Sequence, residues 1–235
     1  MQKYLAQTES PVSVIIPTYN EEKTIGNVIA NTISVMDSRN SPYEIIVVDD
    51  GSTDRTGRIA SQYKATLLTN KTNKGKGYSL RRAIQHANGD IIVTMDSDGE
   101  HQPKEIVDLL VSVFEGTDLV GGSRFLGKSR NSTTKLNSIG NNLFNILIMA
   151  LTGTQITDSQ SGFRAIRRKV LEALNLESDG YEIETEITVK SITKGFKFKE
   201  QPITCQRRRF GNSKIRILRD GVKIIKTIIR FSIKE

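Results

Sequence analysis

Two carboxylates follow an apolar run near the middle of the sequence. Residues 91–95 are expected to form a buried strand, and Asp96, Ser97 and Asp98 come close behind it. Carboxylate oxygens suit a hard divalent cation such as Mg²⁺ or Mn²⁺, which completes its shell with water and phosphate oxygens. The alternative is a solvated turn in which Asp and Gly only serve the backbone geometry. The motif alone fits both a cation site and a turn.

A second pair of carboxylates, Asp49 and Asp50, ends another apolar run. We expect Ser52 or Thr53 to cap the helix that follows, since both are favoured cap residues. Capping does not explain the paired carboxylates. A carboxylate in this position can accept hydrogen bonds from a nucleotide base or a ribose hydroxyl, as the acidic residue of dinucleotide-binding folds does.

A third polar cluster, residues 17–22, follows the first apolar run of the chain. Tyr19 offers an aromatic ring against which a base can lie, and Asn20 can cap the next helix. All three clusters therefore lie at the end of an expected strand.

The elements that carry these clusters alternate in type. Apolar β-branched runs alternate with helical patterns, which predicts a mostly parallel sheet with helices on both faces. Ligands of such sheets lie beyond the carboxyl ends of the strands, where the polar clusters fall. The expected strands are residues 12–16, 44–48, 65–68 and 91–95, and the expected helices span residues 25–36, 80–84 (after a turn at 75–77) and 103–114.

The second half of the chain is less regular. It contains one further apolar run, several helical patterns and two polar stretches. We expect a strand at 118–123, a mobile loop at 124–134, a helix at 136–150, a polar turn at 158–163, a short helix at 169–174, an acidic helix from Tyr181, an edge strand ending near Pro202 and a basic helix from about Lys214.

The composition limits the class of protein. The chain has 235 residues, 37% of them hydrophobic and 26% charged, which is typical of a globular protein. The longest apolar stretch, residues 143–151, is too short to span a membrane, and the first ten residues lack the apolar core of a signal peptide. With Cys205 as its single cysteine, the chain is expected to stay in the cytoplasm.

The net charge of +8 comes from one end of the chain. Residues 206–235 contain ten Lys or Arg and two acids, so the rest of the chain is balanced. The apolar row of the expected helix either packs on the domain or lies on an anionic membrane surface. A nucleic-acid partner is disfavoured, because acidic strand ends repel a polyanion. This row consists of Ile215, Leu218, Val222, Ile225 and Ile229.

Taken in order, these motifs resemble those of the inverting family-two glycosyltransferases. Three of them, GGSRF, QSGFR and RRRFGNSK, are most similar in arrangement to those of the dolichol-phosphate mannose or glucose synthases. The resemblance implies an α/β fold of the GT-A, Rossmann-like type over residues 1–213, followed by a basic amphipathic helix over residues 214–235. The motifs are VSVIIPTYNEE, EIIVVDDGSTD, NKGKG, GDIIVTMDSDGEHQP, GGSRF, QSGFR and RRRFGNSK.

The same resemblance implies roles for individual residues. Arg124 would face the acceptor phosphate and Arg208 a phosphate of donor or acceptor, since Arg binds phosphate in a bidentate way. Glu100 departs from the Gln that these synthases often have, which leaves the metal preference open. The implied residues are Pro17, Tyr19, Glu21, Asp50, Ser97 and Lys214 for the nucleotide, Asp96, Asp98, Arg124 and Arg208 for catalysis, and Asp96, Asp98 and Glu100 for Mg²⁺ or Mn²⁺.

Part of the family pattern is matched less well. An Arg and Ser pair that some synthases carry in the next helix is matched only at Ser138. Thr134 stands in the Arg position, and Lys135 is the candidate substitute.

The implied reaction moves mannose or glucose from GDP-mannose or UDP-glucose to dolichyl or polyprenyl phosphate, with inversion. Such an acceptor needs no general base, since a phosphate monoester with a second pKa of about 6 is already anionic at neutral pH. Transfer to a glycan hydroxyl is the alternative and needs a base. Asp158, Glu182 and Glu184 are candidates, with a turn cap or an acidic helix face as the other interpretation of each.

The expected partners follow from a lipid acceptor. The protein is predicted to bind peripherally to the cytoplasmic face of a membrane, with a small membrane-anchor protein as a further partner. His86 and His101 lack cysteine partners for a zinc site. We expect His101 to be a solvated turn residue and Cys205 a structural strand residue.

Overall fold

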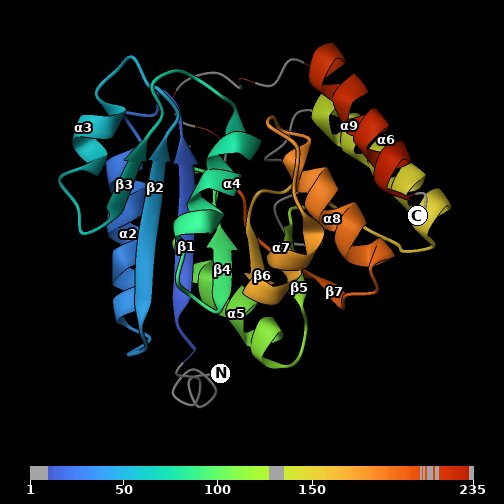
Figure 1. Cartoon of the computed structure of the whole chain (residues 1–235), viewed down its shortest axis with the longest axis horizontal. Helices are drawn as coiled ribbons and strands as arrows, with labels where there is room; N and C mark the ends of the chain where they lie inside the picture. The colour runs from blue at the N-terminus through green and yellow to red at the C-terminus, as the bar shows by residue number, and fades with distance from the viewer. Residues whose placement is uncertain are drawn as a thin grey trace.

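A computed structural model describes residues 10–126, 135–206, 208, 210, 214 and 217–232. In this part of the chain seven strands form one sheet in the order β3-β2-β1-β4-β6-β5-β7, with helices on both faces (Figure 1). The strands are β1 Val12–Thr18, β2 Tyr43–Asp49, β3 Thr66–Thr69, β4 Ile91–Thr94, β5 Leu119–Ser123, β6 Arg164–Arg167 and β7 Phe198–Pro202. The helices are α2 Ile25–Asp37, α3 Thr56–Ala60, α4 Lys76–His86, the 3₁₀ turn η1 Pro103–Glu105, α5 Ile106–Phe114, α6 Lys135–Thr152, α7 Arg168–Leu174, α8 Ile183–Thr193 and α9 Ile217–Ser232.

The first four strands are parallel, as the alternation of apolar runs and helical patterns predicts. β1 lies between β2 and β4, with Val12 opposite Tyr43 on one side and Ile91 on the other. The β-branched residues of β1 are buried because helices cover both faces of the sheet. The predicted strands, the helix at 136–150 and the edge strand ending at Pro202 are confirmed.

One strand was not predicted. β6 lies antiparallel between β4 and β5, with Arg164 opposite Thr94. Its sequence, Arg-Ala-Ile-Arg, has four residues and an Arg at each end, so it lacks the apolar run of a buried strand. The sheet is therefore mixed, and the chain reaches β6 from the polar turn at 158–163.

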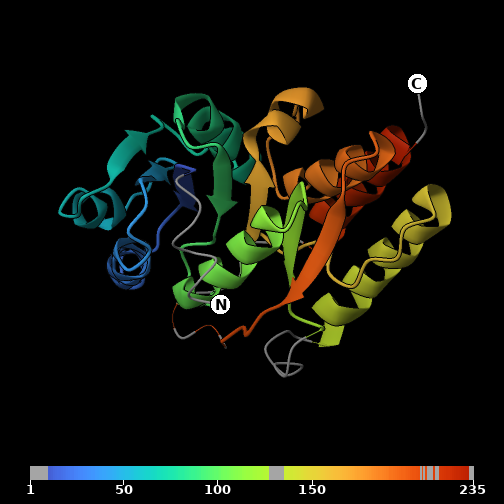
Figure 2. The ribbon, with the colours of Figure 1, turned by 90° about the horizontal axis from the view of Figure 1, so that it is seen from below.

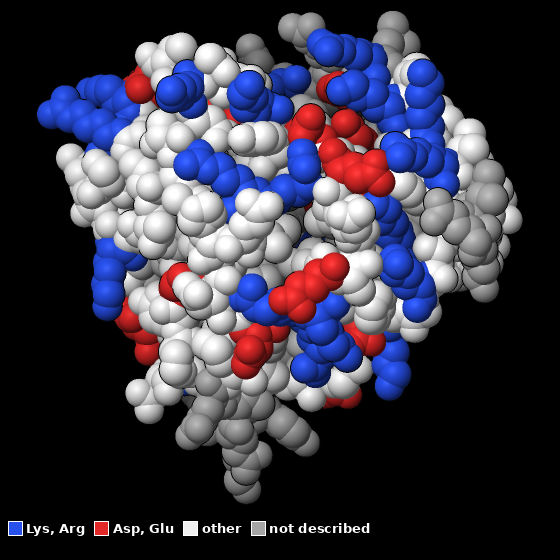
Figure 3. All heavy atoms as spheres, in the orientation of Figure 1, with Lys and Arg blue, Asp and Glu red and all other residues white. Residues whose placement is uncertain are grey.

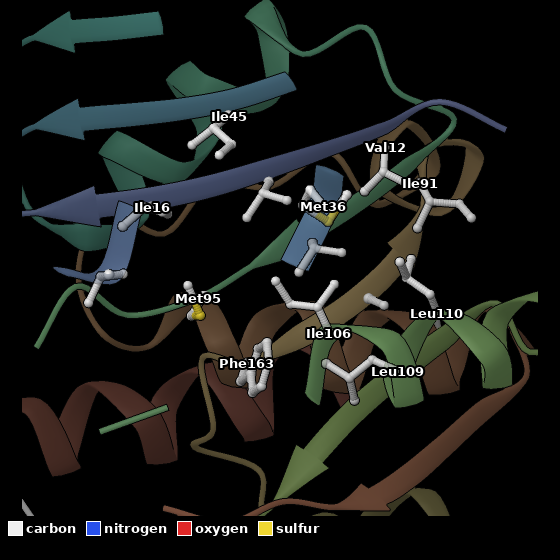
Figure 4. Packing of buried hydrophobic residues seen from close by; sticks show 14 of the residues in the cluster. Val12, Ile16, Met36, Ile45, Ile91, Met95, Ile106, Leu109, Leu110 and Phe163 are labelled. Carbon is white, nitrogen blue, oxygen red and sulfur yellow. The ribbon is translucent and has the colours of Figure 1, made fainter. Parts of the chain in front are cut away.

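Alternate residues of the strands pack on opposite layers. Val12, Val14 and Ile16 of β1 face the layer of α2 and α5, while Ile15 faces the layer of α4, α7 and α8. Figure 4 shows side chains of α5 pointing toward the sheet in the first of these cores. Two tightly packed layers hold the carboxyl ends of the strands in fixed positions.

The predicted helix caps are wrong. α3 begins only at Thr56 after Arg55, and neither Ser52 nor Thr53 caps it. Thr24, not Asn20, precedes α2. These polar side chains instead tie two loops together: Asn20 N–H donates to Ser52 Oγ at 2.9 Å, and Thr53 N–H donates to Asn20 Oδ1 at 2.8 Å. Side chains that suit a cap also suit loop-to-loop hydrogen bonds.

Three helices, α6, α8 and α9, form a small cluster of their own beside the sheet (Figures 1 and 2). α9 buries Ile224 and Ile228 there, whereas Val222 and Ile229 are exposed. Packing therefore does not account for Val222 and Ile229 of the predicted apolar row. Within the described segments, no helix is both long and apolar enough to cross a membrane.

Some predictions concern residues outside the described part. These are the loop at 127–134 with Thr134, the side chains of Lys135 and Leu218, and Ile215. Ser138 lies in α6.

Candidate active site

The site lies where the predicted clusters meet, at the carboxyl ends of β1, β2 and β4. Thr18, the last residue of β1, is opposite Asp49, the last residue of β2. A Cβ placed on Gly99 would lie 3.8 Å from Thr24 Cγ2, so the loop after β4 contacts the loop after β1. The sheet thus brings together motifs that are up to about 80 residues apart in the sequence.

Asp96 belongs to a buried network of charges. Lys76 Nζ lies 2.5 Å from Asp96 Oδ1 and 2.9 Å from Glu184 Oε1. Arg164 Nε lies 3.1 Å from Glu184 Oε2, and both Glu184 and Arg164 are almost completely buried. The network therefore joins the loop after β4 to α4, β6 and α8. Although burial acts in the opposite direction, the charge of Lys76 lowers the pKa of Asp96 to about 2.

A glycine makes this network possible. A Cβ on Gly162 would lie 2.4 Å from Lys76 Nζ and 2.9 Å from both carboxylate oxygens of Asp96. Gly162 belongs to the QSGFR motif. Only the absence of a side chain lets the polar turn lie so close to the ion pair.

Asp98 takes part in a second group of charges, which includes Glu21. Arg208 Nη2 lies 2.7 Å from Asp98 Oδ2 and 3.4 Å from Glu21 Oε1, and Arg208 Nε lies 3.5 Å from Glu100 Oε1. One guanidinium thus contacts one carboxylate that follows β1 and two that follow β4. Burial, with the negative charge of Asp98, raises the pKa of Glu100 to about 7.

Lys214 approaches the same group from the other side. Its Nζ lies 3.0 Å from Glu21 Oε1, donates to the carbonyl oxygen of Tyr19, and lies 5.2 Å from the centre of the Tyr19 ring. Pro17 is buried in β1, opposite Val48. The predicted residues Tyr19, Glu21 and Lys214 are therefore together.

Asp50 is also at the site, but its carboxylate holds a loop. Oδ1 accepts hydrogen bonds from Asn70 Nδ2 at 2.7 Å and from Lys74 N–H at 2.9 Å, and Oδ2 accepts one from Gly75 N–H at 2.8 Å. Gly75 has a φ of 104°, which glycine adopts readily. Asp50 thus shapes the turn before α4, and its contact with a nucleoside stays a prediction.

Arg124 lies just after β5 and is held by Asp158. Arg124 Nε and Nη2 donate to the two oxygens of Asp158 at 2.7 and 2.8 Å, and its backbone N–H donates to Oδ2 at 3.1 Å. Asp158 N–H donates in turn to Glu200 Oε1 of β7 at 2.8 Å. Asp158 thus fixes the guanidinium and the start of the following loop.

The prediction that His101 is a solvated turn residue is wrong, because its side chain is buried. Its ring stacks on Phe163 with 5.1 Å between ring centres, and its Nδ1 accepts a hydrogen bond from Asp96 N–H at 3.4 Å. A short bridge with Cys205 holds its backbone. Local sequence patterns do not predict this stacking, because Phe163 is 62 positions away along the chain.

The three predicted metal ligands do not form one cluster. In the described segments no three Asp, Glu, His or Cys side chains are close enough to share an ion. Lys76 holds Asp96, whereas Arg208 holds Asp98 and Glu100. The role of Glu100 as a third ligand stays a prediction.

A polar cavity of about 450 Å³ borders Asp98 on the side of α2. Thr24, Asn27 and Asn31 of the α2 segment line it, together with His101. Tyr19 and Asp50 are not among its lining residues. Ser97, which stands between Asp96 and Asp98 in the sequence, is buried.

The sequence pointed to the motifs of Lys76 and Arg164 but not to their roles. Both side chains connect through Glu184, which was predicted only as a base or as part of an acidic helix face.

Comparison with known proteins agrees with this geometry. A family model described as Glycosyl transferase family 2 matches residues 13–174, and the chain belongs to this family. Dolichyl-phosphate hexose transferase of Haloferax volcanii is 30% identical over 229 residues, covering 97% of this chain and 96% of that protein. Polyprenol monophosphomannose synthase of Mycolicibacterium smegmatis is 34% identical over 221 residues, covering 86% and 80%.

The fold is also found among solved structures. Glucosyl-3-phosphoglycerate synthase from Mycobacterium tuberculosis, in complex with Mn²⁺, UDP and phosphoglyceric acid, superimposes with a TM-score of 0.81 at 23% identity. The match covers all of this chain and 84% of that one. The predicted GT-A type of α/β fold is thereby confirmed, and the chain is a glycosyltransferase of family 2.

Proposed function

We propose that this glycosyltransferase moves a hexosyl group from a nucleoside diphosphate sugar to a polyprenyl phosphate, with inversion at the anomeric carbon. An oxygen of the acceptor phosphate forms the new bond to that carbon. The bond from the carbon to the diphosphate oxygen breaks, and the nucleoside diphosphate leaves with the electron pair. Relatives named for dolichyl-phosphate and polyprenol-phosphate transfer support this acceptor.

One observation carries the proposal: Arg208 contacts both Glu21 after β1 and Asp98 after β4. The nucleoside motif and the diphosphate motif thus share one site, as a nucleoside diphosphate sugar requires. We propose that Arg208 and Lys214 compensate the charge of a departing diphosphate. We propose Pro17, Tyr19, Glu21 and Asp50 as nucleoside contacts, with Ser97 beside the diphosphate.

The carboxylates fit a divalent ion. Mg²⁺ is usually bound through one or two carboxylates together with substrate phosphates, so Asp96 and Asp98 suffice without a cluster of three. Burial is the main cause of the raised pKa of Glu100, and the negative charge of the nearby Asp98 adds to it. Mg²⁺ or Mn²⁺ held by Asp96 and Asp98 would neutralise charge on the diphosphate.

The surroundings of two of the three candidate bases, Asp158 and Glu184, favour a phosphate acceptor over a glycan hydroxyl. Asp158 is fully engaged by Arg124, and Glu184 is held by Lys76 and Arg164. Neither carboxylate is placed as a general base. A phosphate monoester needs none, and we propose that Arg124, which Asp158 orients, provides a cation for it.

Transfer from a panel of GDP-sugars and UDP-sugars to a short polyprenyl phosphate tests the proposal. We expect an acid-labile glycosyl phosphate from one donor, formed with Mg²⁺ or Mn²⁺ and lost with a chelator. The panel also decides between GDP-mannose and UDP-glucose. Transfer to a glycan hydroxyl, with none to the lipid phosphate, would overturn the acceptor assignment.

A further inference from the structure

The cavity beside Asp98 is an elongated groove along α2. Thr24, Asn27, Asn31 and Ser34 line it at spacings of three and four positions, so they share one side of this segment. Ten residues of helix correspond to about 15 Å. With a volume of about 450 Å³, the groove has the size of a small-molecule site.

The groove offers hydrogen-bonding groups that the protein itself does not use. Four side-chain amides line it, and among the residues that the structure describes they make no hydrogen bond. An amide both donates and accepts hydrogen bonds, as the hydroxyl groups of a sugar do. These amides therefore favour a ligand with several hydroxyl groups. They belong to Asn27, Asn31, Gln102 and Gln206.

Two lysines give the groove a positive charge. Lys23 and Lys104 line it, and within the described part of the chain neither forms an ion pair. Asp98, which also lines it, is held by Arg208 at 2.7 Å. On the face of α4 and α8, by contrast, Lys and Arg lie beside Asp and Glu (Figure 3). Lysine binds phosphate as a point charge, so the two lysines favour an anionic ligand.

An aromatic ring completes the lining. Phe210 of the RRRFGNSK motif is 44% exposed, and Lys23 Nζ lies 5.5 Å from the centre of its ring. The ring offers an apolar surface to the C–H groups of a sugar. The groove thus combines amides, cations and an aromatic ring.

We propose that this groove binds a small sugar phosphate, at a site separate from the proposed donor site. Lys23 and Lys104 would attract the phosphate, and the amides would bind the sugar hydroxyls. A bare phosphate would leave the amides unused, and a neutral sugar would leave the lysines unused. Tyr19 and Asp50, which we propose as nucleoside contacts, are not among the lining residues.

A ligand in the groove would also affect the donor site. Asp98 lines the groove, and Arg208, which holds Asp98, stands two residues before Phe210. The phosphate of the ligand and the diphosphate of the donor would both lie near Asp98, where like charges repel one another. The sugar phosphate would therefore weaken nucleotide binding without excluding it. This coupling rests on the proposed function, whereas the groove itself does not.

Isothermal titration calorimetry of the full chain tests the groove without nucleotide or acceptor. The probes are glucose 6-phosphate, mannose 6-phosphate, glucose and inorganic phosphate. We expect a sugar phosphate to bind about tenfold or more tightly than glucose or phosphate alone, because only the sugar phosphate uses both sets of groups.

Variants locate the binding. Lys104→Gln and Asn31→Leu, both at exposed positions of the groove, should weaken sugar-phosphate binding about tenfold or more. Lys64→Gln and Asn142→Leu make the same changes at exposed positions outside the groove and should bind like the wild type.

A second titration measures the coupling. GDP and UDP are titrated with Mg²⁺, with and without saturating sugar phosphate. We expect the sugar phosphate to weaken nucleotide binding about fivefold or more in the wild type and to have no effect in Lys104→Gln. Without sugar phosphate, this variant should bind nucleotide like the wild type.

Failure of either sugar phosphate to bind the wild type, or unchanged binding by both groove variants, would overturn the site. Complete displacement by nucleotide would place the sugar phosphate in the donor site instead, and an unchanged nucleotide affinity would refute the coupling. Binding of sugar phosphate with no binding of any nucleotide would support the groove and contradict the proposed donor.

Discussion

Replacing Glu184 by Ala is expected to destabilise the protein markedly. Glu184 lies 2.9 Å from Lys76 and 3.1 Å from Arg164, and its side chain is only 3% exposed. Removing one partner of a buried ion pair costs about 3 to 5 kcal/mol, because the remaining charge is left uncompensated. Lys76 keeps Asp96, and Arg164 keeps three other hydrogen bonds. We therefore expect the lower end, about 3 kcal/mol.

Thermal and urea denaturation measure this effect. For a domain of this size, about 3 kcal/mol corresponds to a decrease in Tm of about 10 °C. Glu172→Ala, at an exposed position of α7, is the control and should change stability by less than about 0.5 kcal/mol. If both variants changed stability equally, the charge network would not stabilise the fold as argued.

Three further predictions follow from the site and its supports. Gly162→Ala should reduce transfer, because its Cβ would lie 2.4 Å from Lys76 Nζ and 2.9 Å from the Asp96 carboxylate and would displace this ion pair, and Gly162→Ser should do no better. Asp98→Ala should abolish metal-dependent transfer while leaving the circular dichroism spectrum unchanged; normal activity would remove Asp98 from the proposed ligands. Glu186→Gln should cost roughly 1 to 3 kcal/mol at neutral pH. Burial acts to raise the pKa of Glu186, but hydrogen bonds, first from Lys190, lower it below 4.5. The ionised Glu186 therefore stabilises the fold above about pH 4.5, and this contribution is lost as the pH falls through the lowered pKa. Urea denaturation at neutral pH and in acid should show that the difference in stability between the wild type and Glu186→Gln disappears in acid.

Much of the fold could be predicted because its strands are apolar and β-branched. β1, β2 and β4 are short apolar runs flanked by helical patterns, and such runs are best explained as buried strands. Their polar ends predicted where the site lies, since parallel strands of a sheet end at one edge. β6 was not predicted because its pairing with β4 and β5, and not its own sequence pattern, makes it a strand.

Which charged groups meet could not be predicted. Lys76 and Glu184 are 108 positions apart, and Arg208 reaches Glu21 across 187. Local patterns contain no information on such pairs. Which side of α9 is buried could not be predicted either, because apolar residues occur on more than one side of this helix and only packing selects Ile224 and Ile228.

The anomeric configuration of the product tests the central claim most directly. The product of transfer from an α-linked nucleotide sugar to a short polyprenyl phosphate would be examined by NMR spectroscopy. We predict a β-linked glycosyl phosphate, formed by direct attack of the phosphate oxygen. An α-linked product, or a sugar linked to a hydroxyl group, would contradict it.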